Sequence, residues 1–418
     1  MATSQTAPPV SPPPAPLSMG EVLRISVMRR LWIAQIVSFF GDFLALFAVI
    51  SVLTFKLHAT ADQVTGVQIA YLLPIAILGV IAGVFVDRWP TKPTLVASDS
   101  IRAALVLILM AASRTWHFYA ILAAISVVSS FFGPAQGVAI RAAVPMHGLR
   151  SANALMQQVM FGVRIIGPAA AAFMVAALGP TSCYLADSAS FVASAMLIAS
   201  VAFAAQPAPA PRTAGLGSIW TDMKQGIDFI VHHAALLFVI MAMASGMFVL
   251  GCFGPLIAIY VRDNLHASTQ IFGIASALIG IGMFVGVNLL NTVGKHIKNA
   301  TLVYSGLSGI GAGLVFLAGF TQIWSTMVGD FIIGLAVAGI IIPAQTMIQQ
   351  ETPPALMGRV GSTLMSTIFG AQILGLVLSG ILASAIGVRR VFAVCAVFLV
   401  ILIVVGRLWM EPKGEPVS

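Results

Sequence analysis

The sequence is poor in charge. Only 8% of its 418 residues are Asp, Glu, Lys or Arg, whereas 59% are hydrophobic and the mean hydropathy is +1.02. Soluble domains carry roughly 25% charged residues, and a soluble chain of this length could not bury so much apolar surface. The composition excludes a soluble globular protein and predicts an integral membrane protein, surrounded by lipid. The net charge of +8 is therefore assigned to membrane orientation, and no nucleic-acid partner is expected.

The sequence also lacks the residue patterns of metal sites, disulfide frameworks and hydrolases. Its three cysteines, Cys183, Cys252 and Cys395, lie in separate apolar segments without a C-x-x-C pair, and no His has a Cys or carboxylate at ligand spacing. There is no H-E-x-x-H, no G-x-x-x-x-G-K-[ST] and no nucleophile–His–acid set. We expect no metal and no cofactor, and neither ATP-driven pumping nor membrane-enzyme chemistry is favoured.

Twelve apolar runs reach the roughly 20 residues that a helix needs to cross a bilayer. They are residues 31–54, 66–86, 95–113, 116–138, 152–177, 181–204, 234–261, 269–293, 300–320, 323–347, 358–386 and 388–409. The six Trp residues fall at or just outside the ends of these runs, where interfacial indoles are expected. The Pro-rich first 20 residues are expected to form a disordered tail, and no cleavable signal peptide is visible.

Lys and Arg gather in alternate loops. With the N-terminus inside, fifteen of the 21 basic residues fall in inner segments, Arg102 among them, and five fall in outer segments. Arg164 is the one left inside a span. The positive-inside rule therefore predicts a multi-pass protein of the cell inner membrane with cytoplasmic N- and C-termini. Arg389 and Arg390, on the outer side, break this pattern.

One long linker divides the runs into two sets of six, and the two sets resemble each other. The tripeptide Pro-Ala-Gln ends the fourth run at 134–136 and the tenth run at 343–345, a shift of 209 residues. After one gap the fifth run aligns with the eleventh, so that Arg164 corresponds to Gln372. We predict twelve transmembrane helices in two pseudo-symmetric halves, with a substrate site between them. The divisions are a tail 1–20, a half 21–204, a linker 205–233, a half 234–410 and a tail 411–418.

The segment "GVFVDRWPTKPTLVASDSIR" (83–102) resembles the signature between the second and third helices of the major facilitator superfamily. The residues that fit are Gly83, Asp87, Arg88 and Lys92, while Pro90 and Thr91 depart from the pattern. Asp99 and Arg102, which follow, are similar to the drug-exporter branch that includes macrolide-efflux and enterobactin-export proteins. The resemblance implies a cytoplasmic gate built from these charges, which would latch the two halves in one state. The alternative is that they only enforce topology.

Gly162, Gly167 and Pro168 resemble the antiporter motif in the fifth helix of the same superfamily, with Ala170 and Ala171 in place of its closing Gly-Gly. Small residues allow helices to approach closely and Pro can bend a helix. Tight packing without a transport role is the alternative.

Four charged residues lie inside predicted spans, where charges are costly and face the bundle interior. They are Asp42, Arg164, Asp187 and Asp330. At a rise of 1.5 Å per residue, Arg164 lies roughly 18 Å and Asp187 roughly 21 Å from the inner surface, so we predict that they pair. The pair could be a static structural contact. Asp42 and Asp330 are candidates for proton coupling or substrate binding, with hydrogen bonding to a neighbouring helix as the alternative.

Five uncharged polar residues at comparable depth are candidates to line a cavity: Gln35, Gln136, Asn288, Gln345 and Gln372. The sequence thus predicts a secondary transporter that exports a small amphipathic molecule, such as a drug, macrolide or siderophore, as a monomer and in exchange for protons. The proton gradient would be the energy source. A lipid translocator of the same fold and a multi-pass membrane enzyme are the alternatives.

Overall fold

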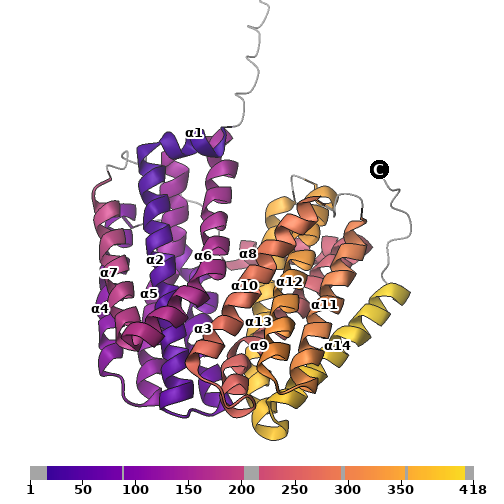
Figure 1. Cartoon of the computed structure of the whole chain (residues 1–418). Coiled ribbons are helices and arrows are strands. Elements are labelled where there is room, and N and C mark those ends of the chain that lie inside the picture. The colour runs from indigo at the N-terminus through magenta and orange to yellow at the C-terminus, as the bar shows by residue number, and fades with distance from the viewer. Residues whose placement is uncertain (1–16, 87–88, 202–215, 293–296, 354–355, 410–418) are drawn as a thin grey trace, which may run out of the picture.

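The computed structural model of the chain describes residues 17–86, 89–201, 216–292, 297–353 and 356–409. These residues form a bundle of long helices and contain no β-strand (Figure 1). The first half comprises α1 (Met19–Arg24), α2 (Ser26–Ser51), α3 (Ala61–Val86), α4 (Thr91–Ile108), α5 (Thr115–Ala143), α6 (Leu149–Leu178) and α7 (Pro180–Ala199). The second half comprises α9 (Ala234–Asp263), α10 (Thr269–Thr292), α11 (Asn299–Gly319), α12 (Ile323–Glu351), α13 (Met357–Ile386) and α14 (Val388–Trp409).

The twelve long helices coincide with the twelve predicted spans, and each begins and ends within five residues of its predicted run. Among the described residues, eleven helices are long and apolar enough to cross a membrane. The remaining one, α6, contributes the shorter apolar stretch Ile166–Leu178. The all-α, twelve-helix membrane fold is confirmed. Apolar run length is sufficient for this prediction because only hydrogen-bonded helices can carry such runs through lipid.

Each half packs on itself, and the two halves meet along two pairs of helices. α2 packs on α7 and α3 on α5, while in the second half α9 packs on α13 and α11 on α12. Between the halves, α6 contacts α10 and α3 contacts α13. We call the end of the bundle where α2 begins and α14 ends the termini end, and the opposite one the far end. In Figure 1 the ribbons of the two halves converge at the far end and diverge toward the termini end.

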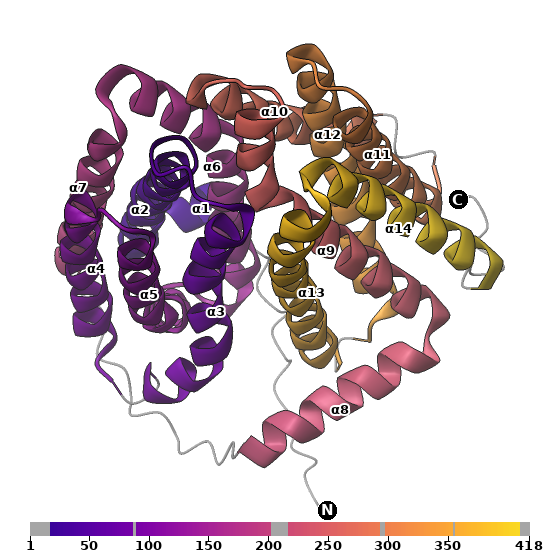
Figure 2. The ribbon, with the colours of Figure 1, turned by 90° about the horizontal axis from the view of Figure 1, so that it is seen from below.

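The linker predicted at 205–233 contains a helix, α8 (Leu216–His232). It runs along the second half, next to α9 and α13 (Figure 2). Gly226 makes this contact possible, because a Cβ there would lie 2.9 Å from the carbonyl oxygen of Arg359 on α13. A linker that carries its own packed helix was not predicted from its Pro- and Gly-containing sequence.

A repeated turn at the far end supports the duplication independently of the Pro-Ala-Gln repeat. The sequence Leu-His-Ala follows α2 at 57–59 and follows α9 at 265–267. Its His adopts a left-handed conformation in both halves, with φ of 49° at His58 and 51° at His266. In both turns the Ala N–H donates to the carbonyl oxygen six residues earlier, at 2.9 Å in the first half and 3.0 Å in the second. The two turns lie 208 residues apart (266 − 58) and end α2 and α9 in the same way, which indicates that these are equivalent helices of the two halves.

Arg389, an exception to the basic-residue pattern, has a local structural reason for its position. Its guanidinium donates to the carbonyl oxygens of Ala318 (3.0 and 2.7 Å) and Gly319 (3.2 Å) at the C-terminal end of α11. A cation is stabilised there by the free carbonyls and by the helix dipole. Two basic side chains cap the C-terminal end of α7 in the same way. Arg30 donates to the carbonyl oxygen of Ser200 at 2.6 Å, and Lys92 donates to that of Val201 at 2.8 Å.

Candidate functional site

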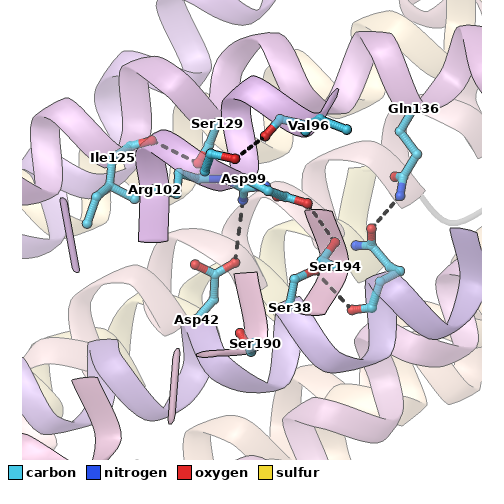
Figure 3. Close-up of polar contacts among 12 residues, drawn as sticks. Ser38, Asp42, Val96, Asp99, Arg102, Ile125, Ser129, Gln136, Ser190 and Ser194 are labelled. Carbon is cyan, nitrogen blue, oxygen red and sulfur yellow. Dashed lines mark hydrogen bonds and ion pairs between the residues drawn. The ribbon is translucent and has the colours of Figure 1, made fainter. Parts of the chain in front are cut away.

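A buried network of charged side chains joins α2, α4 and α7 in the first half (Figure 3). Arg102 on α4 pairs with Asp99, one turn earlier on the same helix, and lies 4.0 Å from Asp42 on α2 (Nη1 to Oδ2). Ser194 on α7 donates a 2.6 Å hydrogen bond to the second oxygen of Asp99. Asp99 is therefore held from two sides, whereas Asp42 is held loosely and its side chain keeps 19% of its surface exposed.

Arg102 lies between two aromatic rings. Its Cζ is 4.5 Å from the ring centroid of Phe132 and 4.2 Å from that of Phe191. Cation–π attraction of this kind strengthens when the cation is desolvated, and Arg102 is only 4% exposed. Its Nε has no hydrogen-bond partner among the described residues. The guanidinium is thus fixed by the two rings and by Asp99, and its Nε–H group is unused within the described residues.

The placement of Arg102 corrects the sequence-based assignment. The charge pattern assigns Arg102 to an inner segment and the resemblance assigns it to the cytoplasmic gate, which leaves Arg164 as the one basic residue inside a span. The structure places Arg102 eleven residues after the start of α4, about 16 Å along the helix. The signal was available, because Arg102 lies within the predicted run 95–113 and its acid is at i−3, on the same face of a helix.

Asp187 lies on α7, 1% exposed, against α2. Ser190 donates to its carbonyl oxygen (2.7 Å) and lies 3.3 Å from its Oδ1. Gly41 allows this approach, because a Cβ at that position would lie 2.5 Å from Oδ1 of Asp187 and would overlap the Ser190 hydroxyl. Asp42 is close enough to Asp187 for their charges to interact, so the two carboxyls belong to one cluster.

Asp187 was predicted to pair with Arg164. The backbone of Arg164 lies in α6, but its side chain is outside the described residues, so the pair stays a prediction. The described cluster contains three carboxyls, those of Asp42, Asp99 and Asp187, and one guanidinium, that of Arg102.

Asp330, on α12 in the second half, is completely buried. Within the described part of the chain, neither of its carboxyl oxygens has a hydrogen-bond partner. Among the described acids, Asp330 alone combines complete burial with two unpartnered carboxyl oxygens, an arrangement that is very costly for an ionised group. It does not join the cluster of the first half, because α12 packs on α10 and α11.

The five predicted cavity residues separate into three groups. Gln136 donates to Gln35 (Nε2 to Oε1, 2.5 Å), which joins α5 to α2 within the first half. Asn288 and Gln345 both line a groove of about 500 Å³. Gln372 contributes its backbone to helix packing, since a Cβ at Gly251 would overlap its carbonyl oxygen.

The groove lies between the halves, on the side of the termini end. Its wall consists of Gln158 from α6, of Met283, Phe284, Val287 and Asn288 from α10, and of Ala338, Ile341, Ile342 and Gln345 from α12. Three amide side chains thus face an otherwise apolar wall. Pockets of this composition suit amphipathic molecules, which need apolar contact area and a few hydrogen bonds.

The far end, in contrast, is closed by contacts between the halves. Phe47 on α2 stacks on Phe272 on α10 with ring centroids 4.7 Å apart. Gly273 meets Ala172 of α6 so closely that any Cβ would overlap it. Arg262 at the end of α9 donates to two carbonyl oxygens of the first half. The conformation is therefore closed at the far end, with a groove between the halves toward the termini end.

The predicted gate and fifth-helix motif are only partly visible. Asp87 and Arg88 lie outside the described residues, and the backbone of Gly83 belongs to α3. In α6, Gly167 packs against the ring of Phe43, 2.8 Å from where its Cβ would be, while Gly162 has open space within the described part. Pro168 is buried, and α6 is continuous across it.

Comparison with known proteins agrees with this architecture. The family model described as Major Facilitator Superfamily matches residues 31–367 and 241–418. The chain belongs to the Major Facilitator Superfamily. It is 28% identical over 385 residues to the uncharacterized MFS-type transporter YfiS of Bacillus subtilis (strain 168). This alignment covers 90% of this chain and 91% of YfiS. It is 24% identical to macrolide efflux protein A of Streptococcus pyogenes over 386 residues, covering 90% and 94% of the two chains.

Among solved structures, a variant of the nucleoside transporter NupG superposes with a TM-score of 0.73 at 12% identity, covering 92% of this chain and 100% of that one. At this identity the likeness shows the fold. Membership of the superfamily makes the chain a transporter and sets aside the membrane-enzyme alternative.

Proposed function

We propose that the protein exports a small amphipathic molecule in exchange for protons, by alternating access between its two halves. The observation that carries the proposal is the excess of carboxyls over guanidiniums in the cluster of the first half, where Asp99 and Asp187 are buried and Asp42 is partly buried. Even with Arg164 added, three carboxyls would face two cations. Burying an uncompensated charge in a membrane protein is costly, so a proton on one carboxyl is the simplest way to balance the cluster.

Asp42 is the carboxyl proposed to exchange this proton. Asp99 is fixed by Arg102 and Ser194, and Asp187 is 1% exposed. Asp42 combines the loosest ion pair, 4.0 Å, with an exposed fraction of 19%. A proton that binds to Asp42 would neutralise its carboxylate, so that Arg102 would pair with Asp99 alone. Loss of this proton would restore the attraction between Asp42 and Arg102. Asp330 is proposed as a second protonation site, in the second half.

The groove of α6, α10 and α12 is the proposed route or binding site of the substrate. Its apolar wall with three amides favours an amphipathic molecule, and the relative named as a macrolide efflux protein supports export. The termini end would face the cytoplasm of the cell, and the protein would act as a monomer. Of the residues that the resemblance assigns to the gate, Gly83, Asp87, Arg88 and Lys92 at the junction of α3 and α4 would form the cytoplasmic gate, while Asp99 and Arg102 belong to the buried cluster. In the present conformation Lys92 bonds to Val201 of its own half, which suits an unlatched gate.

Inverted membrane vesicles test the proposal. With a pH-sensitive dye inside and the membrane energised, addition of erythromycin or ethidium should release protons from vesicles carrying the parent protein. Asp42→Asn should abolish this release. Asp228→Asn, which changes a carboxyl that is 76% exposed on α8, is the matched control and should leave it intact. Unchanged proton release in Asp42→Asn would remove the coupling role of Asp42.

A further inference from the structure

We infer that Arg262 is the latch that holds the far end of the transporter closed, so that its release is required for the outward-open state. Its Nη1 donates to the carbonyl oxygens of Thr54 (2.9 Å) and Ala59 (2.7 Å), which belong to the other half of the molecule. Charge-assisted hydrogen bonds are the strong ones.

The receiving turn is shaped to present both carbonyls to one guanidinium. η1 (Val52–Lys56), a π-helical turn, ends α2, and the left-handed His58 then reverses the chain. Leu57 and Ala59 donate their N–H groups back to Val52 and Leu53, each at 2.9 Å. These bonds leave the carbonyl oxygens of Thr54 and Ala59 free to accept from Arg262.

The guanidinium is also held ready on its own side. Asp263 accepts from Nε at 2.5 Å and from Nη2 at 2.8 Å, which leaves Nη1 directed at the opposite half. The side chain of Arg262 is only 16% exposed, so it is substantially shielded from competing water.

The repeat places this contact at the centre of the far end. The two Leu-His-Ala turns are related by a shift of 208 residues, and the same shift relates Arg262 to Thr54 (262 − 208). Arg262 therefore contacts its own counterpart, and a residue that touches its symmetry mate lies on the axis that relates the two copies. Rocking of the halves about a central site must separate this contact.

The latch rests on alternating access, as proposed above, but its test does not depend on transport or on protons. Ser51, 4% exposed, lies under the latch and its Oγ is 3.4 Å from Oγ1 of Thr269 in the other half. Ser51→Cys gives a thiol that a membrane-impermeant maleimide reaches only when the far end opens. The native cysteines are buried.

In Ser51→Cys protein, Arg262→Ala should raise the labelling rate from the far side about tenfold or more, because two charged hydrogen bonds are lost. Arg389→Ala is the matched control: it also removes an arginine that caps carbonyls at this end, but within one half, so labelling should stay at the parent rate. Right-side-out and inverted vesicles are labelled in parallel, so that the side of access is measured.

An equal labelling rate in Arg262→Ala and its parent would overturn the latch. Thr60→Cys, an exposed position, verifies that the reagent reaches this end. If Arg262→Ala does not accumulate in the membrane, Arg262→Lys serves instead, with a smaller but still measurable increase expected. If the parent protein releases no protons on addition of substrate, but Arg262→Ala still raises the labelling of Ser51→Cys, only proton antiport is contradicted. The two proposals therefore fail separately.

Discussion

At the scale of single residues, the decisive feature is the burial of Arg102 with three carboxyls. Basic residues near helix ends elsewhere in the bundle cap carbonyls, as Lys92 and Arg389 do. Arg102 is different, because it lies between the rings of Phe132 and Phe191 and pairs with acids. Such an ion pair does not add stability simply by existing, since desolvation offsets the Coulomb attraction. Removing one partner, however, leaves the other charge buried.

This asymmetry gives a prediction for the pair of Arg102 and Asp99. Arg102→Leu and Asp99→Leu should each destabilise the protein by about 3–5 kcal/mol, seen as a large drop in melting temperature in detergent. The double variant should lose less than the sum, because neither Arg102 nor Asp99 is then left buried without the other. Strictly additive losses in this double-mutant cycle would show that the two side chains do not act as a pair.

The residues of this cluster were only partly predictable from the sequence. Asp42 and Asp187 stand out because a carboxyl in an apolar run is rare and marks a candidate functional site. Their meeting depends on helix rotation, which depth alone does not give. Gly41 and Ser190 show the missing information: the close contact of α2 with α7 is visible only once the two helices are packed.

At the scale of helices, glycine sets how closely neighbours approach. On α10, a Cβ at Gly282 would overlap the backbone carbonyl of Phe331, and at Gly286 it would lie 2.7 Å from that of Leu335. Gly334 on α12 faces the backbone of α10 in the same way, at Ile279. Association of helices in lipid relies on such close packing, and these two helices carry most of the wall of the groove between the halves.

Gly334→Ala should therefore force α10 and α12 apart and lower the melting temperature of the protein, by an amount equivalent to about 1–3 kcal/mol. Gly311→Ala, on α11, is the matched control, because its Cβ would meet nothing within 4 Å in the described part of the chain. The control should be neutral or slightly stabilising, since Ala is the better helix former. Equal melting temperatures for the two variants would contradict the packing argument.

Helix positions follow from the sequence far better than helix contacts do. The apolar runs gave the ends of all twelve long helices to within five residues, because run length and interfacial Trp residues mark the membrane boundaries. α8 is not predicted, because the segment 205–233 that contains it begins with a Pro-rich sequence. The repeat of the Leu-His-Ala turn was present in the sequence, but its significance depends on the two matching φ angles.

At the scale of the whole molecule, the two halves are closed at the far end and the carboxyl-rich cluster is buried in one of them. A conformation that buries more carboxyls than guanidiniums binds protons more readily than one that exposes them. The termini-open conformation should therefore be favoured by acid, and the far-end-open conformation by alkali. A ligand or proton shifts an equilibrium only through such differential binding.

The most direct test of this account is the distance between the two halves at the termini end as a function of pH. Spin labels at Ala142 on α5 and Gln350 on α12, both exposed, report it by electron–electron double resonance in lipid nanodiscs. We expect a population of longer distances that grows as the pH falls in the parent protein and that does not change with pH in Asp42→Asn. A parent distribution that does not change with pH, or an Asp42→Asn distribution that changes as the parent does, would contradict it.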